Sequence, residues 1–68
     1  MFIMVAGNRK EVKEGLTLSE LMELEQVEMP DYVTVSVNDE FVEADARVAT
    51  ILKEDDQIEF LYFMGGGY

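Results

Sequence analysis

The sequence feature that most constrains the fold is a complete helix start in the first third of the chain. Thr17 occupies the N-cap position and Glu20 follows three residues later, so the two form the capping box T-x-x-E. Apolar residues follow at helical spacing and form one stripe: Leu18, Leu21, Met22 and Leu24. Three acidic residues are expected in solvent: Glu20, Glu23 and Glu25. The helix is expected to end before Pro30, because a proline disfavours the α region in the residue ahead of it.

Most of the other apolar residues follow the pattern of β-strands. Val33, Val35 and Val37 alternate with two hydroxyl residues, which predicts a strand with one face in a core. Gly7 followed by Asn8 supplies the positive φ of a tight hairpin turn. Further strands are expected at residues 2–5, about 9–13, 41–42 and 57–64.

A second, shorter helical segment is expected between the last two strands, over residues 45–52. Its apolar residues have helical or 3₁₀ spacing: Val48, Ile51 and Leu52. One long helix laid across a mixed sheet of four or five strands is the economical way to bury these stripes. We therefore predict an α+β roll in which the first and last strands lie side by side at the centre.

Composition excludes several classes of site. The 68 residues make one small domain without cysteine or histidine, which excludes disulfides, thiolate metal sites and a histidine base. Fifteen acidic against five basic residues give a formal net charge of −10, which argues against nucleic acid as a partner. A basic protein surface would attract this charge, although solubility alone explains it equally well. No apolar run has the length of a membrane span and no signal-peptide pattern is present, so a cytoplasmic location and no membrane partner are expected.

Three consecutive glycines follow the last apolar strand. A glycine run cannot pack a core, so we expect a folded domain at residues 1–64 and a flexible tail at residues 65–68. The tail is either a frayed end or the working part of the protein. Four residues before it are candidates for core packing or for docking a partner: Phe60, Leu61, Phe63 and Met64. The adjacent acids at 39–40 and 55–56 are the usual solvated acids of turns, and no metal site is predicted.

The order of these elements, followed by glycines, resembles the β-grasp (ubiquitin-like) fold and, within it, the ThiS/MoaD-like sulfur carriers. The likeness rests on Gly15-Leu16-Thr17-Leu18-Ser19-Glu20-Leu21, on residues 35–42 and 52–58, and on the glycine run. The short chain is more similar to the thiamin-type (ThiS) carriers than to the longer molybdopterin-type (MoaD) ones. Asp55-Asp56 stands where the family usually has Gly-Asp. The family's final glycine pair falls on Gly66-Gly67, which leaves Tyr68 as an addition.

The resemblance implies a function for the tail. The carboxylate of Gly67 would be adenylated with ATP by an E1-like (ThiF/MoeB-type) enzyme and converted to a thiocarboxylate. A cysteine desulfurase or similar donor would supply the sulfur, and a synthase such as thiazole synthase would accept it. Gly65 and Gly66 would thread into the partner's channel, and a peptidase would first remove Tyr68. The carrier itself would be no enzyme and would bind no cofactor, because the partner uses the ATP.

Several alternatives stay open at this stage. The uncut tail is the substrate form, or this copy of the carrier is inactive. The chain is a ubiquitin-like protein modifier, which shares the activation chemistry and differs in its final acceptor. It is a molybdopterin-type sulfur carrier, or it is a β-grasp binding module whose tail does nothing covalent.

Overall fold

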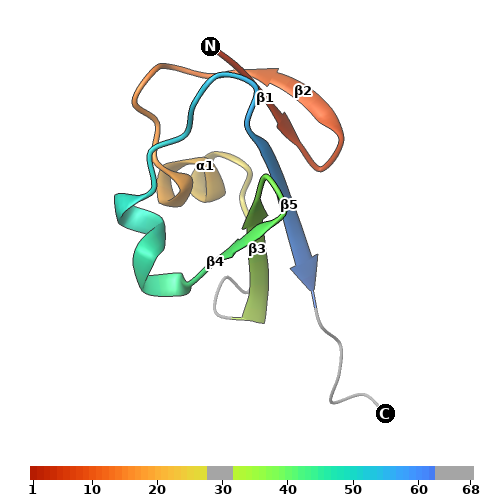
Figure 1. Cartoon of the computed structure of the whole chain (residues 1–68), viewed down its shortest axis with the longest axis vertical. Helices are drawn as coiled ribbons and strands as arrows, with labels where there is room; N and C mark the ends of the chain where they lie inside the picture. The colour runs from red at the N-terminus through yellow and green to blue at the C-terminus, as the bar shows by residue number, and fades with distance from the viewer. Residues whose placement is uncertain (28–31, 63–68) are drawn as a thin grey trace.

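A computed structural model of the chain describes residues 1–27 and 32–62 (Figure 1). In chain order its elements are β1 (Phe2–Val5), β2 (Asn8–Glu11), α1 (Leu18–Leu24), β3 (Val33–Val37), β4 (Glu40–Val42), the 3₁₀ helix η2 (Ala44–Ala49) and β5 (Gln57–Tyr62). The last strand was predicted to reach residue 64, and its final two residues lie outside the described ranges. The tail predicted at residues 65–68 also lies outside them.

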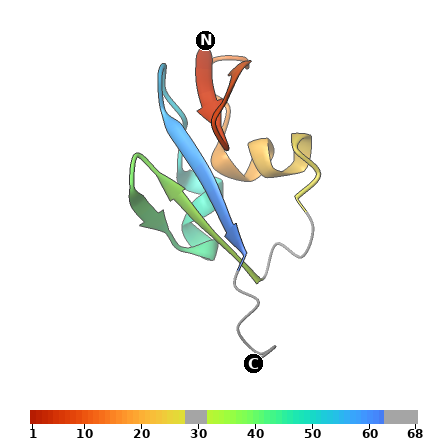
Figure 2. The same cartoon turned by 90° about the vertical axis from the view of Figure 1, so that its right-hand side faces the viewer.

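The five strands form one mixed sheet in the order β2-β1-β5-β3-β4. Strands β1 and β5 are parallel neighbours, and the other neighbouring pairs are antiparallel. Helix α1 lies against one face of this sheet (Figure 2). The predicted α+β roll, with one main helix and the first and last strands together at the centre, is therefore confirmed.

The capping box at the start of α1 is confirmed. The Glu20 N–H donates to the Thr17 hydroxyl at 3.1 Å, and the Thr17 N–H donates back to the Glu20 carboxylate at 3.0 Å. Two features of the helix differ from the prediction. Leu24 is 65% exposed, because Leu21 and its neighbours already fill the narrow stripe that faces the sheet. Glu25 is only partly in solvent, because its carboxylate accepts a hydrogen bond of 2.7 Å from Lys10 on β2.

The turn between β1 and β2 lies one residue earlier than predicted. Val5 pairs with Asn8, so the two central residues of the turn are Ala6 and Gly7, with φ of 50° and 83°. A two-residue hairpin of this kind needs positive φ at both central positions. Asn8 is instead the first residue of β2, which ends at Glu11 rather than near residue 13.

The core lies between α1 and the inner face of the sheet. Its buried members are Ile3, Val5, Leu16, Leu18, Leu21, Met22, Val33, Val35, Leu52 and Ile58. The predicted inward faces of β3 and of the long helix are thus correct for most of their residues. Ser36 was predicted on the outer face of β3, and it lies there opposite Phe41 and Glu59. It is nevertheless buried, because those strands flank it on both sides.

The prediction for residues 45–52 is wrong in which side chains face inward. Val48 and Ile51 are 68% and 59% exposed, and of the expected stripe only Leu52 is buried. A 3₁₀ helix has three residues per turn, so η2 presents Arg47 to the interior instead. Arg47 is 8% exposed, and its Nη2 donates to the Val33 carbonyl at 2.8 Å.

Candidate functional site

The central strand β5 carries the chain toward the predicted tail. β5 runs away from the β1–β2 hairpin and ends at the opposite end of the molecule from the N terminus (Figure 1). Its last residue, Tyr62, pairs with Val33 at the beginning of β3. The main chain that precedes the glycines is therefore held by its neighbours in the sheet up to this pair.

The two described residues of the predicted docking set point to opposite faces of β5. Phe60 pairs with Val35, and it is half-buried and packs against the core. Leu61 pairs with Thr34 on the outer face and is 38% exposed. Of the set, Leu61 is thus exposed on the outer face and Phe60 packs against the core. The other two members, Phe63 and Met64, lie outside the described residues, as do Gly65, Gly66, Gly67 and Tyr68.

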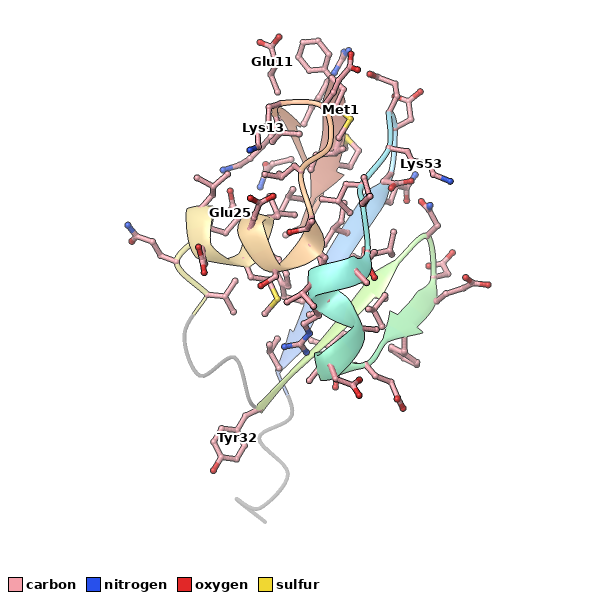
Figure 3. All side chains as sticks on the ribbon, turned by 90° about the vertical axis from the view of Figure 1, so that its left-hand side faces the viewer. Met1, Glu11, Lys13, Glu25, Tyr32 and Lys53 are labelled. Atoms are coloured by element: carbon pink, nitrogen blue, oxygen red, sulfur yellow. The ribbon has the colours of Figure 1, made fainter. Side chains whose placement is uncertain are left out.

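Sequence reasoning missed two aromatic residues on the surface of this region. Phe41 on β4 is 68% exposed and lies opposite Ser36, on the same face of the sheet as Leu61. Tyr32 is 70% exposed and projects into solvent just before β3 (Figure 3). The two-residue turn before β4 was a usable signal for Phe41, because register in a hairpin determines which face each side chain takes.

Comparison with known proteins identifies the family. The model of the ThiS family matches residues 3–67. The chain belongs to the ThiS family. A search of curated proteins finds no match. A crystal structure of the thiamine biosynthesis protein (ThiS) from Geobacter metallireducens has a TM-score of 0.88 and 43% identity, and the match covers 98% of this chain and 100% of that one. A solution structure of a thiamine biosynthesis protein from the same organism has a TM-score of 0.77 and 43% identity, covering 100% and 90% of the two chains.

These matches establish the fold and the general function. The sheet and helix form the β-grasp fold of ubiquitin-like sulfur carriers. The ThiS-family chain is a sulfur carrier of thiamin biosynthesis and not itself a catalyst. The alternatives of a molybdopterin-type carrier, a protein modifier and a non-covalent binding module therefore give way to the thiamin-type carrier.

The acidic turn before β5 of this ThiS-family chain has a structural use. The Asp56 carboxylate accepts hydrogen bonds from the Lys53 N–H at 2.8 Å and from the Asn38 side-chain amide at 2.9 Å. Asp55 has a φ of 68°, a left-handed conformation that glycine adopts without strain. The family's usual glycine at this place thus has a physical reason, and this chain meets the same turn geometry with an aspartate.

The described part of the chain offers no built metal centre. No group of three or more histidine, cysteine, aspartate or glutamate residues within residues 1–27 and 32–62 could hold a metal ion. Of the acidic pair at residues 39–40, Asp39 lies in the β3–β4 turn with a φ of 70°, and Glu40 is the first residue of β4. None of the helices in these ranges has the length and apolar character needed to cross a bilayer.

Within the described ranges, one carboxylate has a clearly shifted pKa, and it lies at the start of α1. The Thr17 N–H bonded to the Glu20 carboxylate is the main reason that the pKa of this group lies below its ordinary value of 4.5. The ammonium of Lys13, 3.9 Å from the other carboxylate oxygen, lowers the pKa further. Hydrogen bonds and opposite charge both favour the ionised form. Glu20 thus stabilises the start of α1 in its ionised form.

Proposed function

We propose that the reactive group of this sulfur carrier is the carboxylate of Gly67, after a peptidase has cleaved the Gly67–Tyr68 bond. The extent of the family match supports this choice, because it includes Gly67 and leaves Tyr68 outside. The place of β5 in the fold is consistent with it. The central strand β5 comes directly before the glycine-containing tail in the sequence. The folded domain can therefore anchor the chain while a partner encloses the tail.

The chemistry begins with activation by an E1-like enzyme of the ThiF/MoeB type, which binds ATP. An oxygen of the Gly67 carboxylate attacks the α-phosphorus of ATP and pyrophosphate leaves, which yields an acyl-adenylate. The terminal sulfur of a persulfide, formed on a donor such as a cysteine desulfurase, then displaces AMP at the carbonyl carbon and gives an acyl disulfide. A second thiol attacks the donor's sulfur of this disulfide, which releases the thiocarboxylate and leaves the two thiols joined as a disulfide. Thiazole synthase accepts this sulfur. Apart from its reacting carboxylate, the carrier contributes only the positioning of that group in the partner's site. Positioning of two reacting groups can lower the barrier of a reaction substantially.

Glycines at 65–67 suit the entry of the tail into a narrow channel, because they have no Cβ to obstruct it. We propose Leu61, together with Phe63 and Met64, as the docking surface beside the tail, and Phe60 as its support in the core. Exposure of Leu61 supports this role, since an apolar side chain next to a working tail is what a partner would contact. The net charge of −10 favours a partner with a basic surface. The cytoplasmic location stays a prediction.

Adenylation of a chain cut after Gly67 tests the proposal. The cut chain, ATP and a cognate E1-like enzyme are expected to give the acyl-adenylate, detected by intact mass spectrometry. Addition of a cysteine desulfurase with cysteine and a thiol reductant is expected to exchange one oxygen for sulfur. The uncut chain is the matched control and is expected to stay unmodified. An uncut chain that is charged as well as the cut one contradicts the cleavage step.

A pair of substitutions tests the role of the tail itself. Gly66→Val adds bulk where the tail enters the channel and is expected to abolish adenylation of the cut chain. Ala46→Val adds similar bulk at an exposed position of η2 and is expected to leave adenylation unchanged. Equal adenylation of both variants contradicts threading. Isopeptide conjugates in place of a thiocarboxylate contradict the carrier chemistry.

A further inference from the structure

Arg47 is a charged side chain that the fold keeps almost fully buried. It belongs to η2 and is 8% exposed, and its Nη2 donates a hydrogen bond of 2.8 Å to the carbonyl of Val33. Burial of a guanidinium is costly unless hydrogen bonds compensate for the lost water. The hydrogen bond from Arg47 to the Val33 carbonyl is therefore expected to hold a particular part of the fold in place.

The alternation of hydrogen bonds along β3 shows which way the Val33 carbonyl points. The Asn38 N–H donates to the Gln57 carbonyl at 2.8 Å, so the main-chain groups of Asn38 face β5. In an antiparallel pair every second residue faces the same neighbour. Counting back from Asn38, Thr34 faces β5, whereas Val33 faces away from it, toward the β4 side of the sheet.

On that side β4 ends too early to supply a donor. Val35 pairs with Val42, so the residue that would lie opposite Val33 is Ala44. Ala44 begins η2 and belongs to no strand. The Val33 carbonyl thus projects from the sheet at a place where the neighbouring strand has stopped. Arg47, one turn of η2 further on, supplies the missing donor.

The residue secured in this way stands at the base of the tail. Val33 and Tyr62 are the last pair of β3 and β5, and the chain continues from Tyr62 toward the glycines. We propose that Arg47 is a positioning residue for the carrier reaction. It fixes the beginning of β3 against the end of β5 and so sets the direction in which the chain leaves the sheet. This inference rests on the proposed function, because direction matters only if the tail enters a partner's channel.

Three variants separate this role from a general effect on stability. Arg47→Met keeps a long side chain and removes the donor, whereas Arg47→Lys keeps a charged donor. Thr50→Val is the matched control in the same segment, because it removes the hydrogen bond of 2.8 Å from the Thr50 hydroxyl to the Ala46 carbonyl. Circular dichroism and thermal unfolding establish that each variant is folded at the assay temperature.

The first readout is hydrogen exchange of the main-chain amides of the full chain. In Arg47→Met we expect exchange at Thr34 and Leu61, the pair next to the end of the sheet, to be about tenfold faster. Exchange at Ser36 and Glu59, deeper in the same pair of strands, is expected to change less. Thr50→Val is expected to leave all four amides as in the wild type.

The second readout is adenylation of the chains cut after Gly67. In Arg47→Met we expect the KM for the carrier to rise about 3-fold or more with kcat nearly unchanged, because a tail without a fixed direction loses more freedom on entering the channel. Across the wild type, Arg47→Lys and Arg47→Met, KM and amide exchange are expected to rise together. A folded Arg47→Met chain with wild-type KM overturns the inference, whether or not its exchange is faster. A wild-type chain that is never adenylated refutes the proposed function, and this inference falls with it.

Discussion

Replacement of Thr17 by alanine tests the capping box, the local interaction that begins α1. The substitution removes the hydroxyl that accepts the Glu20 N–H at 3.1 Å, and it leaves the main-chain half of the capping box in place. Helix α1 spans only Leu18–Leu24. The complete capping box satisfies about half of the main-chain N–H groups that the first turn leaves without a helical partner, namely those of Thr17 and Glu20. Such a short helix has little other local support.

The size of the effect follows from the contacts. Loss of an N-cap threonine costs about 1 kcal/mol in the free energy of unfolding. A domain of this length has a total stability of roughly 3 to 10 kcal/mol. The expected fall in Tm is therefore about 4 to 8 °C. Thr17→Ser keeps the hydroxyl and is the matched control, with an expected loss of less than about 0.5 kcal/mol.

The other half of the box adds a pH dependence with a definite sign. The pKa of Glu20 in the fold lies below its ordinary value of 4.5, first because of the Thr17 N–H and then because of Lys13. Ionised Glu20 therefore stabilises the fold above pH 4.5, and this contribution is lost as the pH falls through the lowered pKa. Glu20→Gln keeps an acceptor but does not titrate. Its stability is expected to fall less steeply than that of the wild type between about pH 5 and pH 3.

Urea denaturation followed by far-UV circular dichroism measures these differences at neutral pH and along the acidic series. Thr17→Ala and Thr17→Ser with the same unfolding midpoint would refute the reasoning for the cap. An acid limb of Glu20→Gln that superimposes on the wild type would refute the assignment of the lowered pKa. Both refutations are independent of the tail and of any partner enzyme.

Substitutions at three further positions probe the turns and the surface. Asp55→Gly replaces a residue at a φ of 68° and is expected to stabilise the fold by about 0.5 to 1 kcal/mol, which thermal unfolding would measure. Asn38→Ala removes the acceptor of the Gln57 N–H at 2.9 Å and is expected to cost about 1 to 2 kcal/mol. Asn38→Gly relieves the φ of 54° but also loses the bond, so a cost as large as that of alanine would show that the bond dominates. Lys10→Met breaks the exposed ion pair to Glu25 and is expected to cost less than about 1 kcal/mol at low salt and still less at 1 M salt, and a larger cost in urea titrations would contradict a surface role.

Short-range patterns predicted the helix start, the strands and their order well. The capping box involves residues three apart, and the alternation in β3 involves neighbours, so the signal lies within a few positions. Where a local pattern admits two answers, the prediction was less exact. Gly7 marked the first hairpin correctly, but pairing of Val5 with Asn8 and of β1 with β5 determined that Ala6 and not Asn8 completes the turn.

In the candidate site, too, the sequence predicted some features and only the strand register decided others. The glycine run and the elements before it were sufficient to indicate a carrier of the ThiS type, and the family match agrees. Sequence alone left Phe60 and Leu61 equivalent, as core or docking residues. The register of β5 against β3 turned Phe60 toward the core and left Leu61 on the outer face.

What the sequence determined by itself are the features set by neighbouring residues: the capped helix, the alternating strands and a glycine run that cannot pack. Tertiary structure alone decided that Arg47 is buried while Val48 and Ile51 are exposed. The reason is that β4 stops short of Val33 and leaves a carbonyl facing η2, a circumstance that depends on the pairing of three strands. A buried carbonyl without a donor from a neighbouring strand needs another hydrogen-bond donor, which here is Arg47. The spacing of residues in the sequence does not indicate where such a carbonyl lies.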